Sequence, residues 1–265
     1  MNAPVSRPFT VALAQAPLAW HDAAANRAAF EALLAPLAGQ VDLVVLPEMF
    51  TTGFTMEPAA VAEAPGGATQ AWLVAQARAL DAAVTGSHVC RDGARHLNRL
   101  LWATPDGEVR HYDKRHLFRM AGEHERYAPG GELLVVPWRG LRCGLLVCYD
   151  LRFPVWSRRR AEFDYDVLVY VANWPAPRRE AWRALLVARA IENQCYVVGV
   201  NRVGQDGKGL DYRGDSLVVD PRGRVLADAG ESTGVVTAAL DRSALMQFRD
   251  RFPAHLDADR FTLAE

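Results

Sequence analysis

The sequence lacks an excess of positive charge. Among its 265 residues, 30 lysines and arginines face 31 aspartates and glutamates, so the formal net charge is −1. Proteins that bind nucleic acid or an anionic membrane surface draw on clustered positive charge and on counterion release. The balanced charge therefore argues against both classes of protein and favours a small-molecule ligand.

Long apolar runs are also missing. No stretch approaches the roughly 18 consecutive apolar residues of a membrane-spanning helix, and the apolar residues 9–16 are interrupted by Gln15. So short a segment fits a first β-strand better than the core of a signal peptide. The sequence therefore predicts a cytoplasmic protein without a membrane anchor.

The sequence lacks the cysteine and histidine spacing that disulfide or metal chemistry requires. The spacing of the four cysteines matches neither a CxxC metal motif nor a disulfide framework; they are Cys90, Cys143, Cys148 and Cys195. Three histidines, His111, His116 and His124, are not spaced by one helical turn, and no HExxH motif is present, which disfavours a zinc hydrolase. We expect free thiols, no metal and no cofactor.

The chain reads as a single domain over residues 1–265, because no repeat, low-complexity tract or linker divides it. At this length it should bury about three quarters of its unfolded surface. Segments typical of strands recur throughout, at residues 10–14, 41–46, 83–89, 97–103, 133–136, 141–147, 166–172, 196–201, 216–219 and 234–239. Several are continuous valine-rich runs, as in strands that are covered on both faces.

Helical patterns lie between these strands. Apolar residues repeat at helical spacing over residues 30–37 and 182–189, a third helix is expected at residues 68–80, and Pro154 suits the first turn of a fourth that runs toward Glu162. The strands are too many for one doubly wound sheet of this length. We therefore predict an α/β fold in which two sheets pack face to face with helices outside.

Three segments place a reactive side chain directly after an apolar strand, where a rigid scaffold holds it. The first is Glu48, which follows residues 41–46 and precedes Met49 and Phe50. An apolar pocket raises the pKa of a carboxyl group and makes it a usable general base near neutral pH. A capping or salt-bridging glutamate would show the same pattern.

The second segment carries Lys114, flanked by aromatic residues after a hairpin strand. Its ammonium group can stabilise a developing oxyanion, and an ordinary surface lysine is the alternative.

In the third segment a buried strand runs into Cys148, and Pro154 opens a helix soon after. At such an elbow a cysteine is exposed as a nucleophile and the backbone N–H of Tyr149 can point at a substrate oxygen; a buried structural cysteine is the alternative.

Together these segments resemble the nitrilase superfamily, the carbon–nitrogen hydrolases with a Glu-Lys-Cys triad. The resemblance covers most of the chain, through VALAQAP, LPEMFTTGF, YDKRHLFRMAGEHERYAPGG, VCYDLRFPVW, VANWPAPR, LLVARAIENQCYVVGVNRVG and YRGDSLVVDPRG. The last segments are most similar to the ω-amidase branch, which hydrolyses the terminal amide of 2-oxo acids such as 2-oxoglutaramate and 2-oxosuccinamate. The resemblance implies a four-layer αββα sandwich of two mixed sheets that commonly forms a homodimer by joining sheets.

By this resemblance Glu48 is the general base, Lys114 the oxyanion stabiliser and Cys148 the nucleophile that forms a thioester. Members also carry a second glutamate six residues before a Pro-Gly pair. Here Pro129-Gly130 points back to Glu123, with the nearby Glu125 as the alternative.

An ω-amidase must also hold the carboxylate and keto group of its substrate, which requires a cation a few carbon lengths from the nucleophile. The candidates are Arg178, Arg152 and Arg202, with Trp174 and Phe118 as apolar walls. Arg178 is preferred because it lies beyond the strand next to that of Cys148. Arg152 lies close to Asp150 in the sequence, so an internal ion pair between these two is favoured over substrate binding.

Other interpretations stay open. Another aliphatic amidase, an N-carbamoyl amidohydrolase or a true nitrilase would share the same triad. From a different class, a catalytically silent binding module would keep the fold. The presence of every expected triad residue type argues against the silent form.

Overall fold

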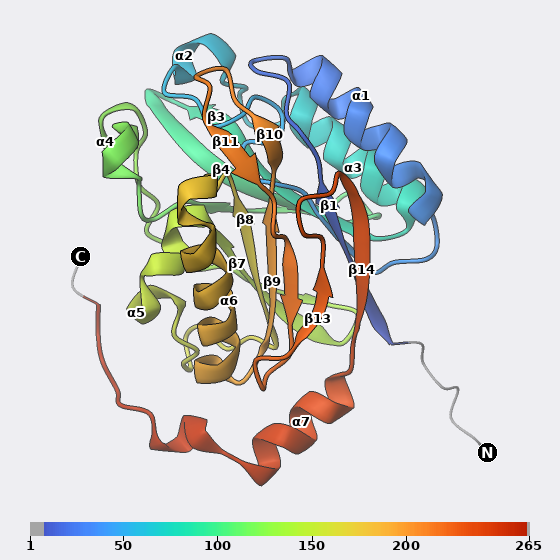
Figure 1. The fold of residues 1–265 in the computed structure, drawn as a ribbon, viewed down its shortest axis with the longest axis vertical. Helices are drawn as coiled ribbons and strands as arrows, with labels where there is room; N and C mark the ends of the chain where they lie inside the picture. The colour runs from blue at the N-terminus through green and yellow to red at the C-terminus, as the bar shows by residue number, and fades with distance from the viewer. Residues whose placement is uncertain (1–7, 264–265) are drawn as a thin grey trace.

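The computed structural model describes residues 8–263. Two six-stranded sheets pack face to face, and helices cover their outer faces (Figure 1). This arrangement is the αββα sandwich that the sequence predicts. None of the helices in the described residues is long and apolar enough to cross a bilayer.

The first sheet has the strand order β14-β1-β2-β3-β4-β5. Its strands are β1 (Phe9–Gln15), β2 (Leu43–Val45), β3 (Ala83–Asp92), β4 (Arg95–Ala103), β5 (Val109–Asp113) and β14 (Gly234–Leu240). Strands β1, β2 and β3 are parallel, whereas β4 is antiparallel to both β3 and β5. Strand β5 therefore runs in the same direction as β2 and β3.

The second sheet has the order β13-β12-β9-β8-β7-β6. Its strands are β6 (Val135–Trp138), β7 (Leu141–Val147), β8 (Val167–Ala172), β9 (Tyr196–Asn201), β12 (Leu217–Val219) and β13 (Val225–Asp228). Strands β7, β8 and β9 are parallel. All ten strands expected from the sequence are present. A short hairpin of β10 (Val203–Gln205) and β11 (Asp211–Arg213), which was not expected, stands apart from both sheets.

Alternation along the strands produces the layers. In β1, Val11 and Leu13 join the core between the two sheets, whereas Ala12 and Ala14 face the outer helices. The helices α1 (Ala23–Leu34) and α3 (Ala68–Leu80) pack on that outer face. A buried valine or leucine such as Val11 or Leu13 contributes roughly 1.5–3 kcal/mol, and a buried alanine contributes less.

Helix α6 (Arg179–Asn193) covers the second sheet, on the side opposite α1 and α3 (Figure 1). It packs so closely that a Cβ atom at Gly199 would lie 2.5 Å from Leu186 Cδ1, so this position in β9 requires glycine. The remaining helical elements are α2 (Pro58–Val61), α4 (Glu123–Arg126), α5 (Pro154–Ser157), α7 (Arg242–Arg251), η1 (Ala35–Leu37), η2 (Arg119–Ala121), η3 (Cys148–Arg152), η4 (Ala176–Arg178) and η5 (Ala254–Asp257).

Helix α5 is shorter than expected. The sequence predicts a helix from Pro154 toward Glu162, but α5 ends at Ser157. Arg158 adopts an extended conformation, and Arg160 forms an isolated β-bridge with Phe163. This local pairing competes with continuation of the helix.

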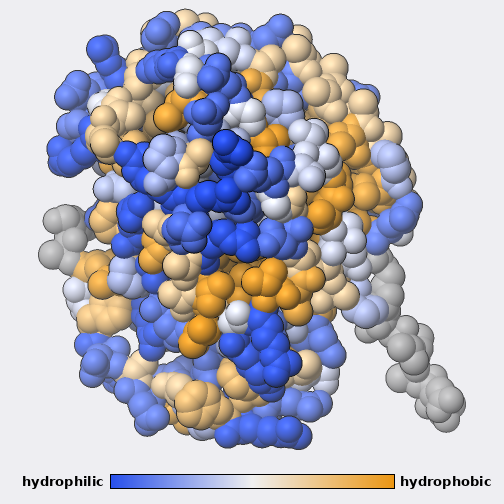
Figure 2. Space-filling model, viewed as in Figure 1, coloured by the Kyte–Doolittle hydropathy of each residue, from blue (hydrophilic) through white to orange (hydrophobic). Residues whose placement is uncertain are grey.

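The surface of this face is mainly hydrophilic, with an apolar patch over α6 and β13 (Figure 2). Exposed apolar side chains in these two elements are Ile191, Val225 and Leu226.

The strand directions bring four chain segments to one end of the sandwich. Strands β2 and β5 of the first sheet, and β7 and β8 of the second, are followed by Glu48, Lys114, Cys148 and Asn173. Because parallel strands end at the same edge of a sheet, these residues are held close together by two rigid sheets.

Candidate active site

Three of the residues singled out in the sequence form one buried ionic cluster. Lys114 Nζ lies 2.9 Å from Glu48 Oε1 and 2.9 Å from Glu123 Oε2. Glu48 and Glu123 are fully buried, and Lys114 is 1% exposed. The alternative of Lys114 as an ordinary surface lysine is therefore wrong.

Both carboxylate oxygens of Glu48 are held by donors. Oε1 accepts from Lys114 and from Asn98 Nδ2, the latter at 2.7 Å, and Oε2 accepts from the backbone N–H of Asn173 at 2.8 Å. Asn173 Nδ2 in turn donates to the backbone carbonyl of Glu48. Residues from both sheets thus determine the orientation of this carboxylate.

Glu123, rather than Glu125, belongs to the cluster. Its Oε2 accepts the backbone N–H of Phe118 at 2.6 Å, in addition to the contact with Lys114. The Glu125 side chain is 68% exposed and is paired only weakly with His124, at 3.9 Å. The glutamate six residues before Pro129-Gly130, Glu123, is therefore the one that contacts Lys114.

Cys148 occupies the elbow that the sequence predicts. It follows β7 directly, begins η3, and has a φ of +44°, a left-handed conformation that is uncommon for a residue with a side chain. Its Sγ lies 3.9 Å from the backbone oxygen of Asn173. The side chain is 8% exposed and lines a cavity.

The surroundings of Cys148 keep its sulfur protonated. Burial, the negative charge of Glu48 and a hydrogen bond with that carboxylate raise the pKa of the thiol well above its ordinary value, and the nearby Lys114 ammonium only partly opposes them. A thiol with a raised pKa needs a base to become nucleophilic. Glu48 is the carboxylate placed to act on it.

Lys114 keeps its charge in spite of burial. Burial by itself lowers the pKa of a lysine, but the carboxylates of Glu123 and Glu48 outweigh it and raise the pKa of Lys114 well above its ordinary value. Burial also raises the pKa of Glu123, against the influence of Lys114. The cluster thus places two carboxylates around one ammonium group.

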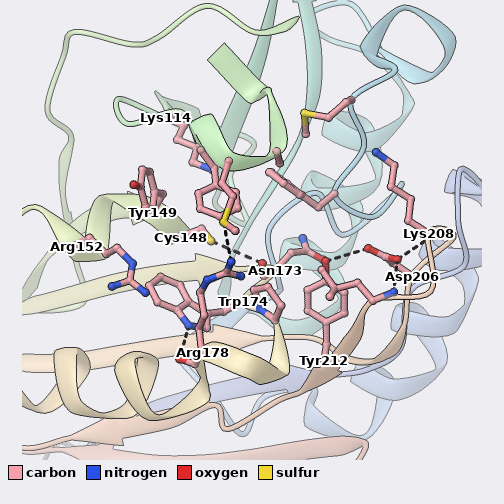
Figure 3. A pocket seen from close by; sticks show the side chains of 17 residues that line it. Lys114, Cys148, Tyr149, Arg152, Asn173, Trp174, Arg178, Asp206, Lys208 and Tyr212 are labelled. Atoms are coloured by element: carbon pink, nitrogen blue, oxygen red, sulfur yellow. Dashed lines mark hydrogen bonds between the residues drawn. The ribbon is translucent and has the colours of Figure 1, made fainter. Parts of the chain in front are cut away.

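The cavity at this site has a volume of about 260 Å³ and is mostly apolar (Figure 3). Its buried end, which we call the floor, is lined by Cys148 and Lys114, which are 8% and 1% exposed. Four of the five side chains named from the sequence as possible substrate contacts line the cavity, namely Arg178, Arg152, Trp174 and Phe118, and so does Tyr149. Arg178 lies over the Phe118 ring at 5.5 Å, and Arg152 lies over the Trp174 ring at 4.8 Å.

The expected ion pair between Arg152 and Asp150 is wrong. Asp150 is buried and accepts hydrogen bonds from the Tyr112 hydroxyl at 2.8 Å, from His116 Nδ1 at 2.7 Å and from the backbone N–H of Val147 at 3.0 Å. Within residues 8–263 no ion pair of Arg152 is found. Donors from β5, the following loop and β7 satisfy the Asp150 carboxylate. The Arg152 guanidinium is therefore not paired with it, and Arg152 lines the cavity.

Arg202 is not among the residues that line the cavity. It is fully buried, donates to the backbone oxygens of Val203 and Gln205, and lies 4.7 Å from the Tyr212 ring. It therefore supports the β10–β11 hairpin behind the cavity wall and is too deeply buried to meet a substrate carboxylate.

Sequence reasoning missed the side of the cavity that the β10–β11 hairpin forms. Asp206, Lys208, Leu210 and Tyr212 line it. In Figure 3, Asp206, Lys208 and Tyr212 lie opposite Arg152 and Tyr149. The Asp206 carboxylate accepts the backbone N–H groups of Lys208 and Leu210, at 2.8 and 3.0 Å, and the Tyr212 hydroxyl at 3.1 Å. The sequence contained one signal for this side of the cavity. Lysine is rare in the chain, which has only Lys114 and Lys208, so each lysine was a candidate for a functional role.

In the described part of the chain, no group of three or more histidine, cysteine, aspartate or glutamate side chains is arranged to hold a metal ion. His116, one of the histidines considered for zinc, is bonded to Asp150. The four cysteines are free and buried.

Comparison with known proteins places this geometry in a family. Residues 10–250 match the carbon-nitrogen hydrolase family. The chain is 50% identical to omega-amidase YafV of Escherichia coli K12 over 255 residues, 96% of this chain and 98% of that protein. It is 36% identical to a 2-oxoglutaramate amidase of Bacillus subtilis over 219 residues, which are 82% of this chain and 84% of that one.

A solved structure agrees with the sequence comparisons. A CN-hydrolase superfamily protein from Xanthomonas campestris, with an arsenic adduct in its active site, superposes with a TM-score of 0.94 at 51% identity and covers 97% of this chain and 99% of that one. With the Glu-Lys-Cys arrangement at the carboxyl ends of two packed sheets, these findings show that the chain belongs to the carbon–nitrogen hydrolases of the nitrilase superfamily, enzymes that act on carbon–nitrogen bonds other than peptide bonds.

Proposed function

We propose that this hydrolase is an ω-amidase, which converts the monoamide of a 2-oxo dicarboxylic acid, such as 2-oxoglutaramate or 2-oxosuccinamate, to the free acid and ammonia. The observation that carries the proposal is the charge of the cavity. Arg152, Arg178 and Lys208 line it, and none of the three forms an ion pair within residues 8–263. Its one lining carboxylate, Asp206, is already engaged by the hairpin. A small substrate with a carboxylate would supply the missing negative charge.

The names of the relatives support the same substrate class. The relative from Escherichia coli is an omega-amidase and that from Bacillus subtilis is a 2-oxoglutaramate amidase. Another aliphatic amidase or an N-carbamoyl amidohydrolase shares the catalytic cluster, so the substrate assay must include both classes.

The first chemical step is attack on the amide carbon. Glu48 takes the proton of the Cys148 thiol as the sulfur adds to the carboxamide, which forms the carbon–sulfur bond and places the negative charge on the amide oxygen. Because burial and the charge of Glu48 raise the pKa of the thiol, the sulfur needs a base to give up this proton. Glu48 is positioned to receive the proton, because Lys114 and the backbone N–H of Asn173 fix the orientation of its carboxylate.

The oxyanion is stabilised by the Lys114 ammonium and by the backbone N–H of Tyr149. Lys114 lies at the cavity floor with its position determined by two carboxylates. Tyr149 follows Cys148 at the elbow, where its N–H is at the start of η3. A single donor of this kind contributes roughly 10²- to 10³-fold to the rate.

The intermediate collapses when the carbon–nitrogen bond breaks. Protonated Glu48 gives its proton to the departing nitrogen, ammonia leaves, and a thioester stays on Cys148. Glu48, again ionised, takes a proton from a water molecule, the hydroxyl adds to the thioester, and the sulfur leaves with that proton. One carboxylate therefore acts as base, acid and base again.

Glu123 has a different task, because the Cys148 thiol is hydrogen-bonded to Glu48, whereas Glu123 accepts from Lys114 and from the backbone N–H of Phe118. We assign it to hold the ammonium group in place and charged. Arg178 and Arg152 would bind the substrate carboxylate between the walls of Phe118 and Trp174, and Lys208 would complete the charge from the opposite side.

A substrate panel tests the proposal directly. Ammonia release is measured side by side from 2-oxosuccinamate, 2-oxoglutaramate, glutamine and an N-carbamoyl amino acid. The proposal expects the two 2-oxo acid amides to have the highest kcat/KM. A preference for the N-carbamoyl compound, or turnover of none of them by enzyme that can be labelled at Cys148, would contradict it.

We also propose that the enzyme acts in the cytoplasm as a homodimer or larger homo-oligomer. Four cysteines without a disulfide fit a reducing compartment. The apolar patch over α6 and β13 fits a contact between copies of the chain (Figure 2). Light scattering on the purified protein measures its mass in solution, and a monomer at all concentrations would contradict the second part.

A further inference from the structure

Asn98, on β4, contacts three members of the buried cluster. Its Nδ2 donates to Glu48 Oε1 at 2.7 Å and to Glu123 Oε1 at 3.3 Å, and its backbone oxygen accepts the N–H of Lys114 at 3.0 Å. The side chain is 1% exposed and is not among the residues that line the cavity. Asn98 therefore acts on the cluster and not on the substrate.

Two neighbours determine which way the Asn98 amide points. The backbone N–H of Met49 donates to Ser87 Oγ at 2.8 Å, which leaves the Ser87 hydroxyl to donate to Asn98 Oδ1, also at 2.8 Å. Because Oδ1 is engaged in this way, the NH₂ group faces the two carboxylates. The reversed amide would place its oxygen against carboxylate oxygens.

The cluster needs such a donor. Two buried carboxylates around one ammonium leave an excess negative charge, which burial penalises and which a bound proton would relieve. A proton on Glu48 would remove the base. Hydrogen bonds to the ionised form of a carboxylate oppose this uptake, and those to charged groups are the stronger ones.

We infer that Asn98 is a positioning residue that keeps Glu48 and Glu123 ionised together, so that Glu48 is available as the base. The inference rests on the proposed function, because it takes Glu48 to be that base. Ser87 has a supporting part, since it holds the amide in the orientation that donates.

The test is the pH dependence of an Asn98→Leu variant. Leucine has a similar size, offers no donor and excludes water from the site. At pH 7 we expect kcat/KM for 2-oxosuccinamate to fall by about ten- to hundredfold, the range for loss of a hydrogen bond to a charged group. Activity should recover toward the wild-type value as the pH rises, because the carboxylates then ionise without help, and KM should change little.

Two further variants separate this effect from a loss of packing. Ser87→Ala keeps the Asn98 amide but frees its orientation, so we expect a smaller fall with the same recovery at high pH. Asn193→Leu is the matched control: Asn193 is also a buried asparagine, and its Nδ2 donates to the Arg189 oxygen at 3.0 Å, at the end of α6. Its pH profile should be that of the wild type.

Infrared titration provides a readout that needs no substrate. Asn98→Leu should show the C=O band of a protonated carboxylic acid at a pH where the wild type shows only carboxylate bands. The inference is overturned if Asn98→Leu loses activity by one factor at every pH, or keeps wild-type activity, without a new acid band. If the wild-type enzyme hydrolyses no amide, the proposed function fails, and the infrared result still decides the part that Asn98 plays in ionisation.

Discussion

The chain has two lysines, and both line the same cavity, yet they belong to different kinds of structure. Lys114 follows β5, the edge strand of the first sheet, is 1% exposed and is held by two carboxylates. Lys208 is exposed on the β10–β11 loop and forms no ion pair in the described part of the chain. We call the side of the cavity with Arg152, Arg178 and Lys208 the rim. At the floor the ammonium of Lys114 is paired with carboxylates of the protein, whereas the cations of the rim form no ion pair within residues 8–263.

This difference separates the groups proposed to catalyse the reaction from those proposed to select the substrate. Strand ends hold the reacting groups because two packed sheets cannot shift one residue without moving many. The cations that we propose meet the substrate lie on the β10–β11 loop and at the ends of the short 3-10 helices η3 and η4, where solvent screens an unpaired charge at small cost. Changes at the floor should therefore lower kcat, and changes at the rim should raise KM.

The largest effect is expected at the nucleophile. Cys148→Ala removes the covalent route, so ammonia release should fall below a few per cent of the wild-type rate. Cys143→Ala, in strand β7 that leads to Cys148 but inside the core, is the control and should stay active with some loss of stability. Mass spectrometry of the wild-type enzyme during turnover should detect the acyl adduct on Cys148. Product that accumulates without that adduct would count against the mechanism.

The two lysines themselves give the next comparison. Lys114→Arg should lower kcat by about 10²- to 10³-fold, because a planar guanidinium does not fit between Glu48 and Glu123 and cannot replace a compact ammonium. Lys208→Arg keeps a cation on an exposed loop and should stay within about threefold of the wild type. Equal losses in both variants would mean that floor and rim do not differ as described.

Removal of rim cations should act on binding. Arg178→Ala should raise KM for 2-oxosuccinamate by roughly tenfold with a smaller change in kcat, since it removes a partner of the substrate carboxylate. Lys208→Ala should do the same more weakly. Asparagine offers the matched substrate control, because it has the carbon chain and terminal amide of 2-oxosuccinamate but carries an amino group in place of the keto group. An unchanged KM in Arg178→Ala would exclude that residue from substrate binding.

The smallest effect concerns the scaffold beneath the floor. Burial lowers the pKa of His88, on β3, to about 4, although the charge of Glu63 opposes the shift. Between an unfolded value near 6.5 and the folded value, the unfolded state binds the proton that the native state refuses, so stability falls as the pH is lowered through this window. The loss should be about 1 kcal/mol per pH unit.

Urea unfolding at pH 7, 5.5 and 4.5 measures this loss. His88→Gln should flatten the dependence of stability on pH, whereas the exposed His111→Gln should leave it unchanged. A slope that is the same in both variants would assign the acid sensitivity to other groups.

Much of the fold and of the floor was predictable from the sequence. Apolar runs marked all ten expected strands, and the reactive residues that follow two of them, Glu48 and Cys148, lie in one site with Lys114, which follows the hairpin strand β5. These features are local, because a valine-rich run favours a buried strand wherever it pairs. Glu123 was preferred to Glu125 because of its distance from Pro129-Gly130 in the sequence. The structure agrees, since Glu123 contacts Lys114.

The rim and the support of the floor were less predictable. The ion pair of Arg152 with Asp150 was inferred from closeness in sequence, but Asp150 turns toward Tyr112 and His116. The hairpin that carries Lys208 has short strands of mixed polarity, which give little periodic signal. Asn98 lies in a strand as an ordinary polar residue, and nothing around it in the sequence points to Glu48.

The sequence by itself determined which residues carry reactive groups and at which strand ends they stand, because strand formation and the order of residues along the chain are local properties. Only the tertiary structure decided which charges meet and which stay free. Asn98 and Glu48 are 50 residues apart, and Asn173 and Glu48 are 125 apart, yet each pair is joined by a hydrogen bond. Such contacts depend on how two sheets pack on each other, and no short stretch of sequence contains that information.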